Sequence, residues 1–388
     1  MNLLHLLQSR GVIFIAPETT FIAADVSPER IAAGVTVHPG CRLGGAELSV
    51  GPGCVIGAEA PATVSDCQLG AKVHLAGGFF DHATFLNGFK SGSGAHVRPG
   101  CLFEEESSIA HTVGVKQTVF LPWVAAGSLI NFCDCLMAGG TGRKNHSEIG
   151  SSYIHFNFTP HQDKATASLI GDVPHGVLLN QPAIFLGGQG GLVGPCVLAF
   201  GTVIPAGQIW RGDVTEPGRL VAKPSLRSTL NTPYDPRQYH GVRRIVRNNL
   251  LYIGNLLALD LWYRVFRAPF MQSDPFQAAC YDGARHRLAE MLAERLSRLD
   301  ELVKKTAQAQ TAEEDRACVA AWPAMKDALT AQLAAREAAA IPEAVQAVAT
   351  SLPAKDYLRE IQALPPETAQ TLAAWLASCP AAAAALLA

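Results

Sequence analysis

Large apolar residues recur at every sixth position over long parts of the first half of the chain. The clearest runs pass through Val97, Phe103, Ile109 and Val115, and through Leu192, Leu198 and Ile204. A six-residue period fits neither an amphipathic helix nor a simple alternating strand. It is typical of hexapeptide repeats, in which three hexads form one triangular coil and successive coils stack. We therefore expect a mainly β fold, a left-handed parallel β-helix.

Four segments repeat the same short pattern of an aliphatic residue, turn residues and a small apolar residue. They lie at 37–41, 50–54, 97–101 and 192–196, and each ends in a cysteine. We expect these cysteines to fill narrow interior positions, because buried thiols pack like small hydrophobic side chains. The ten cysteines include no Cys-x-x-Cys pair, and no signal peptide is evident. A reducing, cytoplasmic location is the prediction.

The sequence changes character near residue 225, where Gly, Pro and β-branched residues give way to Ala, Leu, Arg and Glu. We predict a β-helix over 1–225 and an α-helical region over 226–388. Asp274-Pro275 predicts a helix start, and Pro269 predicts the end of the helix before it. We expect helices to cover an open end of the β-helix, since an uncapped coil leaves backbone groups unpaired.

The hexad pattern lapses twice, and both gaps are predicted to be loops inserted into the coils, near 79–94 and 138–172. The second is the densest polar stretch of the chain and carries His146, His155 and Lys164 among other polar residues. Loops on a rigid scaffold often hold functional sites. We therefore look for the site in the second gap.

Net charge and hydropathy exclude two classes of partner. The formal charge is −2 and there is no basic patch, so nucleic acid is not an expected partner. The most apolar long segment, 250–271, contains Asp260, Arg264 and Arg267. It is predicted to be a buried or interfacial helix and not a membrane span.

The second gap contains motifs that resemble a known family. Ser147-Glu148-Ile149-Gly150, Asn157-Phe158-Thr159-Pro160, Lys164-Ala165-Thr166 and Ile170-Gly171-Asp172 follow one another in order. They resemble the acetyltransferase half of the bifunctional N-acetylglucosamine-1-phosphate uridyltransferases, and the likeness extends more weakly over 97–204. The glycine-rich nucleotide loop of the uridyltransferase half has no counterpart here. Uridyltransferase, or pyrophosphorylase, activity is therefore the weaker expectation.

The resemblance implies a set of site residues. In that family a histidine takes a proton from the sugar amine, and the candidates here are His146 and His111. The family's position for this base, about nine residues before Glu148, holds no histidine. The implied substrate-binding residues are cations, amides and an imidazole suited to a sugar phosphate or sugar nucleotide. They are Arg98, Lys116, Asn131, Arg143, Lys144, His155, Asn157 and Lys164.

The resemblance also implies acetyl-CoA as co-substrate, bound in a groove between subunits of a homotrimer. The glycine-rich segment of Gly187, Gly188, Gly190 and Gly191 is the candidate for that contact. A tight turn made for packing explains these glycines equally well. Acyl transfer of this type needs no metal, only alignment, a base and an oxyanion donor.

Two functions of different classes stay open. One is an acyltransferase that acts on a phosphorylated or nucleotide-linked amino sugar. The other is a non-catalytic sugar-nucleotide sensor or scaffold, which the missing family-position histidine favours. A weaker third possibility is carbonic-anhydrase-type metal chemistry with His111, His146 and His155 as ligands.

Overall fold

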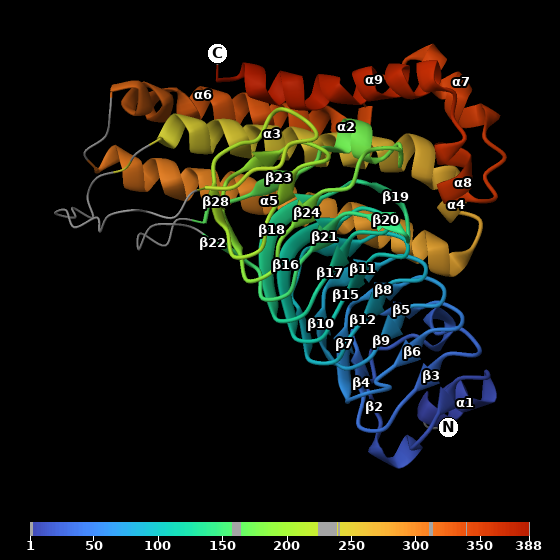
Figure 1. The fold of residues 1–388 in the computed structure, drawn as a ribbon. Helices are drawn as coiled ribbons and strands as arrows, with labels where there is room; N and C mark the ends of the chain where they lie inside the picture. Colours follow the sequence, from blue (N-terminus) through green and yellow to red (C-terminus); the bar gives the residue numbers. More distant parts are fainter. Residues whose placement is uncertain are drawn as a thin grey trace, which may run out of the picture.

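The computed structural model describes residues 3–156, 164–223, 239, 241–309, 313–338 and 340–387. Between residues 13 and 211, short strands pair in parallel with strands of the preceding and following coils. The chain therefore winds into a parallel β-solenoid, as the six-residue period predicts. A layer of helices lies along it (Figure 1).

The solenoid has three faces. Face one is a ten-stranded sheet with one strand from each coil, so the solenoid makes about ten turns. Its strands are β1 (Ile13–Phe14), β3 (Thr36–Val37), β6 (Val55–Ile56), β9 (His74–Leu75), β12 (Lys90–Ser91), β15 (Ser108–Ile109), β17 (Ala125–Ala126), β21 (Glu148–Ile149), β24 (Phe185–Leu186) and β27 (Val203–Ile204).

Faces two and three are joined by two long strands that bend around the corner between them, β16 (Val113–Phe120) and β18 (Ile130–Met137). Face two also contains β2 (Phe21–Ile22), β4 (Arg42–Gly44), β7 (Ala62–Ser65), β10 (Gly78–Asp81), β13 (Ala95–Val97), β22 (Ile154–Phe156), β25 (Gly191–Val193) and β28 (Ile209–Arg211). Face three contains β5 (Ser49–Val50), β8 (Gln68–Leu69), β11 (Ala83–Phe85), β14 (Cys101–Phe103), β23 (Ser168–Ile170) and β26 (Val197–Leu198).

The hexad residues fill the interior of the solenoid. Val97, Phe103, Ile109 and Val115 are all nearly inaccessible to solvent. Cys41, Cys54, Cys101 and Cys196 are fully buried free thiols, as the repeated segments predict. Burial raises the pKa of the Cys196 thiol to about 11, so it packs as a neutral group.

The loop predicted for 79–94 is wrong, because β10, β11 and β12 in this segment pair in register with the coils on both sides. This coil is shorter than its neighbours: Leu75 pairs with Ser91, only sixteen positions later. Aromatic residues take the interior positions that aliphatic residues hold in other coils. The ring centroid of Phe85 lies 5.3 Å from that of Phe103, on which it stacks, and 4.8 Å from that of Phe89. These large rings fill the interior of the shortened coil.

The second gap is only partly a loop. β21, β22 and β23 continue the coils, while an antiparallel hairpin of β19 (Gly140–Gly142) and β20 (Asn145–His146) projects from them. The short helix α2 (Val173–Gly176) follows, and its amino end is capped by the Asp172 side chain. Residues 157–163 lie outside the described part of the chain.

The C-terminal region is helical from Val242 onward, in keeping with the predicted change of composition. Its α-helices are α3 (Val242–Trp262), α4 (Ala268–Met271), α5 (Pro275–Ala307), α6 (Glu313–Ala335), α7 (Glu343–Ser351), α8 (Tyr357–Gln362) and α9 (Pro366–Ala385), and α1 (Leu3–Ser9) lies at the other end of the chain. Asp274 caps α5 as predicted, accepting hydrogen bonds from the backbone N–H groups of Phe276 and Gln277. Pro269 does not end the preceding helix, because a π-helical turn, Tyr263–Arg267, leads into α4 and places this proline in its first turn.

The helices cover face three, along the side of the solenoid. The sequence predicts instead that they cover an open end of the β-helix. Helix α5 packs along β5, β8, β11 and β14, and α3 packs on β23. On the earlier coils of this face the outward-facing positions hold the buried polar residues Ser49, Gln68 and Thr84. On the later coils they form a row of apolar, fully buried residues, Leu102, Val119 and Leu136. Such a row must be covered to leave water. At Gly283 of α5 the approach is so close that a Cβ would lie 2.2 Å from Gln68 Oε1.

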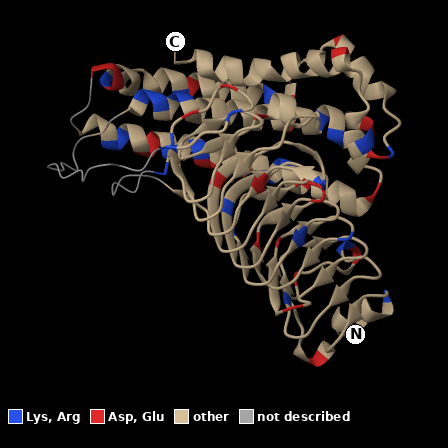
Figure 2. Ribbon diagram, in the orientation of Figure 1, with Lys and Arg blue, Asp and Glu red and all other residues tan. Residues whose placement is uncertain are grey.

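Charged side chains are more frequent in the helical layer than along the strands (Figure 2). Among the described helices, none is both long enough and apolar enough to cross a bilayer. The buried segment predicted at 250–271 is indeed internal, with Leu256, Leu259 and Trp262 fully buried.

Candidate functional site: a cationic pocket between the solenoid and helix α5

Two predicted cations stack on neighbouring coils at the end of face two. Val97 pairs with Val115, and Lys116 pairs with Cys133, so Arg98, Lys116 and Cys133 occupy equivalent places on three successive coils. Neighbouring strands lie about 4.8 Å apart. The resulting ladder places a guanidinium, an ammonium and a thiol along one edge of the solenoid.

A cavity of about 430 Å³ opens beside this ladder, and we call it the cationic pocket. Its lining comes from the corner between faces two and three and from α5. The lining residues are Arg98, Lys116, Asn131, Cys133, Asp134, His155, Phe156, Lys164, Thr166 and Glu294. Five of the predicted substrate-binding residues therefore meet in one place: Arg98, Lys116, Asn131, His155 and Lys164. Asn157 lies outside the described residues.

The polar groups of the pocket are connected to one another. The Arg98 guanidinium donates to Cys133 Sγ at 3.1 Å, and that thiol donates to Asn131 Oδ1 at 3.3 Å. Burial raises the pKa of Cys133 although Arg98 opposes the shift, so the thiol stays protonated and is no ready nucleophile. Lys116 Nζ lies 3.9 Å from Glu294 Oε1, which is an ion pair without hydrogen-bond contact.

The acidic residue Asp134 has its own partner. The buried Arg295 of α5 donates a hydrogen bond to its carboxylate and also to the Lys164 carbonyl, at 3.4 Å. Burial raises the pKa of Asp134, and the positive charge of Arg295 counteracts this. Asp134 is thus matched by Arg295. Glu294 is the other described carboxylate that lines the pocket, beside Arg98, Lys116 and Lys164, and it is itself paired with Arg298.

His155 is the imidazole that lines the pocket among the described residues. It pairs with Leu192 on the next coil, is only 5% exposed, and its Nε2 lies 2.9 Å from Ser168 Oγ. Burial lowers the pKa of His155 to about 4. The ring is therefore neutral at physiological pH and suited to hydrogen bonding more than to holding a proton.

The two predicted catalytic histidines do not line the cationic pocket. His146 lies in the β19–β20 hairpin, with Nδ1 3.0 Å from the Arg143 carbonyl. His111 follows β15, and its Nδ1 lies 2.9 Å from Ser128 Oγ. Neither ring is among the residues that the structure brings together with Arg98 and Lys116.

Arg143 and Lys144 also lie in the hairpin and away from the pocket. The Arg143 guanidinium binds the Glu106 carbonyl and approaches its carboxylate at 3.9 Å. The hairpin is held from the other side by Gln362 of α8, whose amide donates to the Thr141 carbonyl at 2.9 Å. These two cations belong to a separate surface of the molecule.

The predicted acetyl-CoA glycines lie where coils stack closely. A Cβ at Gly187 would meet the Ala206 nitrogen at 2.2 Å, and one at Gly190 would meet the Gln208 carbonyl oxygen at 2.8 Å. Gly188 and Gly191 are similarly confined, by Ser151 and Phe156. Contact between coils accounts for all four positions, and their role in cofactor binding stays a prediction.

The described residues contain no cluster of three or more His, Cys, Asp or Glu side chains that could hold a metal ion. His111, His146 and His155 therefore do not form the metal site considered above within one chain.

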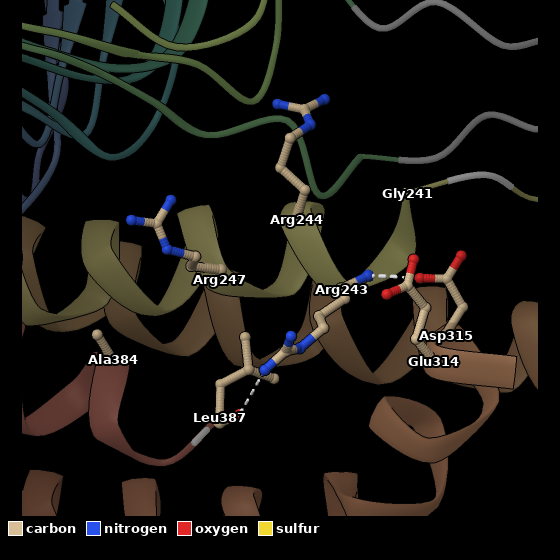
Figure 3. A pocket seen from close by; sticks show the side chains of 8 residues that line it. All are labelled: Gly241, Arg243, Arg244, Arg247, Glu314, Asp315, Ala384 and Leu387. Carbon is tan, nitrogen blue, oxygen red and sulfur yellow. Dashed lines mark hydrogen bonds between the residues drawn. The ribbon is translucent and has the colours of Figure 1, made fainter. Parts of the chain in front are cut away.

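A second cavity, about 470 Å³, lies at the start of α3, and we call it the arginine cleft (Figure 3). Arg243, Arg244 and Arg247 line it together with Glu314 and Asp315 of α6. Its arginine side chains already have hydrogen-bond or ion-pair partners within the chain. Asp315 accepts from the Arg243 backbone N–H at 2.8 Å, and Arg244 donates to the Pro195 carbonyl at 2.9 Å. The cationic pocket, where Lys116 has an ion pair at 3.9 Å and five predicted substrate-binding residues meet, is the better candidate site.

Several pocket residues escape the sequence analysis. The position of Cys133 and Asp134 could have been found from the repeat, because they lie one coil after Lys116 and Gln117. The role of Glu294 has no such indication in the sequence, since it reaches the pocket from a helix more than a hundred residues away along the chain.

Comparison with known proteins agrees with the resemblance drawn from the loop motifs. Over 228 aligned residues the chain is 26% identical to the bifunctional protein GlmU of Nitratidesulfovibrio vulgaris, in strain DP4 and in strain Hildenborough. The alignment covers 55% of this chain and 42% of the relative, so the chain spans less than half the length of the curated proteins it matches. No family model matches the chain.

Proposed function

We propose that the cationic pocket binds the phosphate of a phosphorylated or nucleotide-linked amino sugar, and that the protein transfers an acyl group from acetyl-CoA to its amino group. The observation that carries the proposal is the convergence of Arg98, Lys116 and Lys164 on one cavity with Asn131 and His155. Guanidinium and ammonium groups bind phosphate oxygens through charge-assisted hydrogen bonds. The similarity to GlmU supports a transferase related to nucleotide sugars.

The acyl donor and the assembly are part of the same proposal. Acetyl-CoA would lie in a groove between neighbouring solenoids of a homotrimer, so that one site draws on two subunits. A cytoplasmic location suits the ten free cysteines. His146 and His111 lie outside the pocket, so the base that deprotonates the amine would be His155, a residue of another subunit, or solvent.

A second function has its own support, namely a non-catalytic protein that binds sugar nucleotides. The imidazole in the pocket has a pKa of about 4, which makes it a weak base, and neither predicted catalytic histidine lines the cavity. Binding without transfer needs only the cations and amides.

Calorimetric titration separates these functions. We expect the purified chain to bind UDP-N-acetylglucosamine and acetyl-CoA, and to acetylate glucosamine 1-phosphate. Lys116→Ala should weaken sugar-nucleotide binding at least about tenfold, because it removes a charged hydrogen-bond donor. Lys90→Ala is the matched control, since Lys90 is an exposed lysine on face one.

Each outcome is decisive. Binding of both ligands with turnover supports the acyltransferase, and binding of the sugar nucleotide alone supports the non-catalytic protein. If the wild-type protein does not bind the sugar nucleotide, the cationic pocket is not its binding site. The same follows if Lys116→Ala and Lys90→Ala lose equal affinity for it.

A further inference from the structure

Helix α5 forms one wall of the cationic pocket. Among the described residues that line it, all come from the solenoid except Glu294, which lies in the middle of α5. The same turn of the helix carries Arg295, which anchors it to Asp134 at the corner between faces two and three. The helical layer thus completes the site as well as covering face three.

Glu294 is held firmly and kept ionised. Arg298 Nε donates a hydrogen bond to Glu294 Oε1 at 2.9 Å, and Arg298 Nη2 makes an ion pair with the same oxygen at 2.8 Å. Arg298 is itself fixed by Glu301, at 2.9 and 2.8 Å. Burial favours the neutral acid, but Arg298 and Lys116 outweigh it and lower the pKa of Glu294. The carboxylate therefore stays negatively charged at neutral pH.

The position of this carboxylate is unusual for a site that binds only anions. Glu294 lies 3.9 Å from Lys116 Nζ, near enough to repel a phosphate on that lysine and too far to make a full hydrogen bond with it. Its side chain is 22% exposed, so solvent and ligands can reach it. A fixed anion beside three cations matches a ligand that itself carries both charges.

We propose that Glu294 is a specificity-determining residue that accepts a hydrogen bond from an ammonium group of the ligand while Arg98, Lys116 and Lys164 hold its phosphate. The ligand class is a zwitterionic amino-sugar phosphate, in preference to the corresponding neutral-sugar phosphate. This inference rests on the proposed function, because it requires that the pocket binds a sugar phosphate.

The test compares two probes that differ at one group, glucosamine 1-phosphate and glucose 1-phosphate. By calorimetry we expect the wild-type protein to bind the amino sugar about tenfold more tightly, because one ligand gains an ion pair and the other meets an unpaired carboxylate. Glu294→Gln should bring the ratio of the two dissociation constants close to one. Glu301→Gln is the control, since Glu301 also binds Arg298 but does not line the pocket.

The ratio distinguishes the failure of this inference from the failure of the proposed function. If both phosphates bind and the ratio is the same in Glu294→Gln as in wild type, Glu294 does not determine specificity although the pocket binds sugar phosphates. If neither phosphate binds the wild-type protein, both proposals fall. Glu294→Asp, which keeps the charge but shortens the side chain, should retain a reduced preference and serves if the glutamine variant does not fold.

Discussion

Arg267 is a buried cation that ties the helical layer to the solenoid, and its removal should cost much of the stability of that contact. The side chain is fully buried, and Arg267 Nη2 donates to both Glu105 carboxylate oxygens at 2.8 Å. Its guanidinium also lies 3.8 Å from the ring centre of Tyr357. Arg267→Met would remove these contacts and leave the carboxylate of Glu105 buried without its cation, next to Glu104.

The expected loss is about 3–5 kcal/mol in the free energy of unfolding, the range for removing one partner of a buried ion pair. The double variant Arg267→Met, Glu105→Gln should lose less than Arg267→Met alone, because no unpaired charge remains at position 105. Urea unfolding followed by both tryptophan fluorescence and circular dichroism measures these values, provided that the two transitions coincide. A loss below about 1 kcal/mol in the single variant, or no recovery in the double variant, would refute the reasoning.

Two further predictions concern the same interface and the packing within the helical layer. Burial, opposed by Arg267, raises the pKa of Glu104 from an ordinary value near 4.5 to about 7. This carboxyl therefore stabilises the fold fully below about pH 4.5 and loses that contribution as the pH rises through 7. Between about pH 5 and about pH 8, the melting temperature of the wild-type protein should fall relative to that of Glu104→Gln. If the melting temperatures of the two proteins change with pH in parallel, the raised pKa of Glu104 is contradicted. Gly254 of α3 faces α9 so closely that a Cβ would lie 2.4 Å from Pro380 Cα. Gly254→Ala should thus lower stability by about 1–3 kcal/mol despite the higher helix propensity of alanine, and an unchanged or raised melting temperature would count against this packing.

The solenoid was predictable because its pattern is local. Each hexad places one large apolar residue inside, so Val97 and Val115 identify neighbouring coils from their separation alone. The family resemblance implied Arg98 and Lys116 as site residues, and the strand register places them on neighbouring coils. The six-residue spacing failed at 79–94, where Phe80, Phe85 and Phe89 fill a shortened coil and the six-residue count is lost while the strand pairing continues.

The lateral position of the helices also had a signal in the sequence. On the later coils of face three the inward residue is preceded by an apolar outward one, as in Leu102-Phe103, Val119-Phe120 and Leu136-Met137. On the earlier coils the outward residue is polar, as Ser49, Gln68 and Thr84 show. A strand that is apolar on both sides is buried on both sides. The histidines were harder to place, because a projecting hairpin carries His146 away from the corner where the cations meet.

The contribution of α5 to the site could not be read from local sequence, and it follows from how the two parts of the chain stabilise each other. The apolar outward residues on the later coils of face three, such as Leu102, need the helices to leave water, and α5 in turn buries Leu288 and Leu292. Once apolar packing fixes α5 on this face, the next polar positions along the helix fall at the corner of the solenoid. Arg295 then meets Asp134, and Glu294 meets Lys116. The same packing that makes the two layers one folded unit therefore sets the charge balance of the cationic pocket.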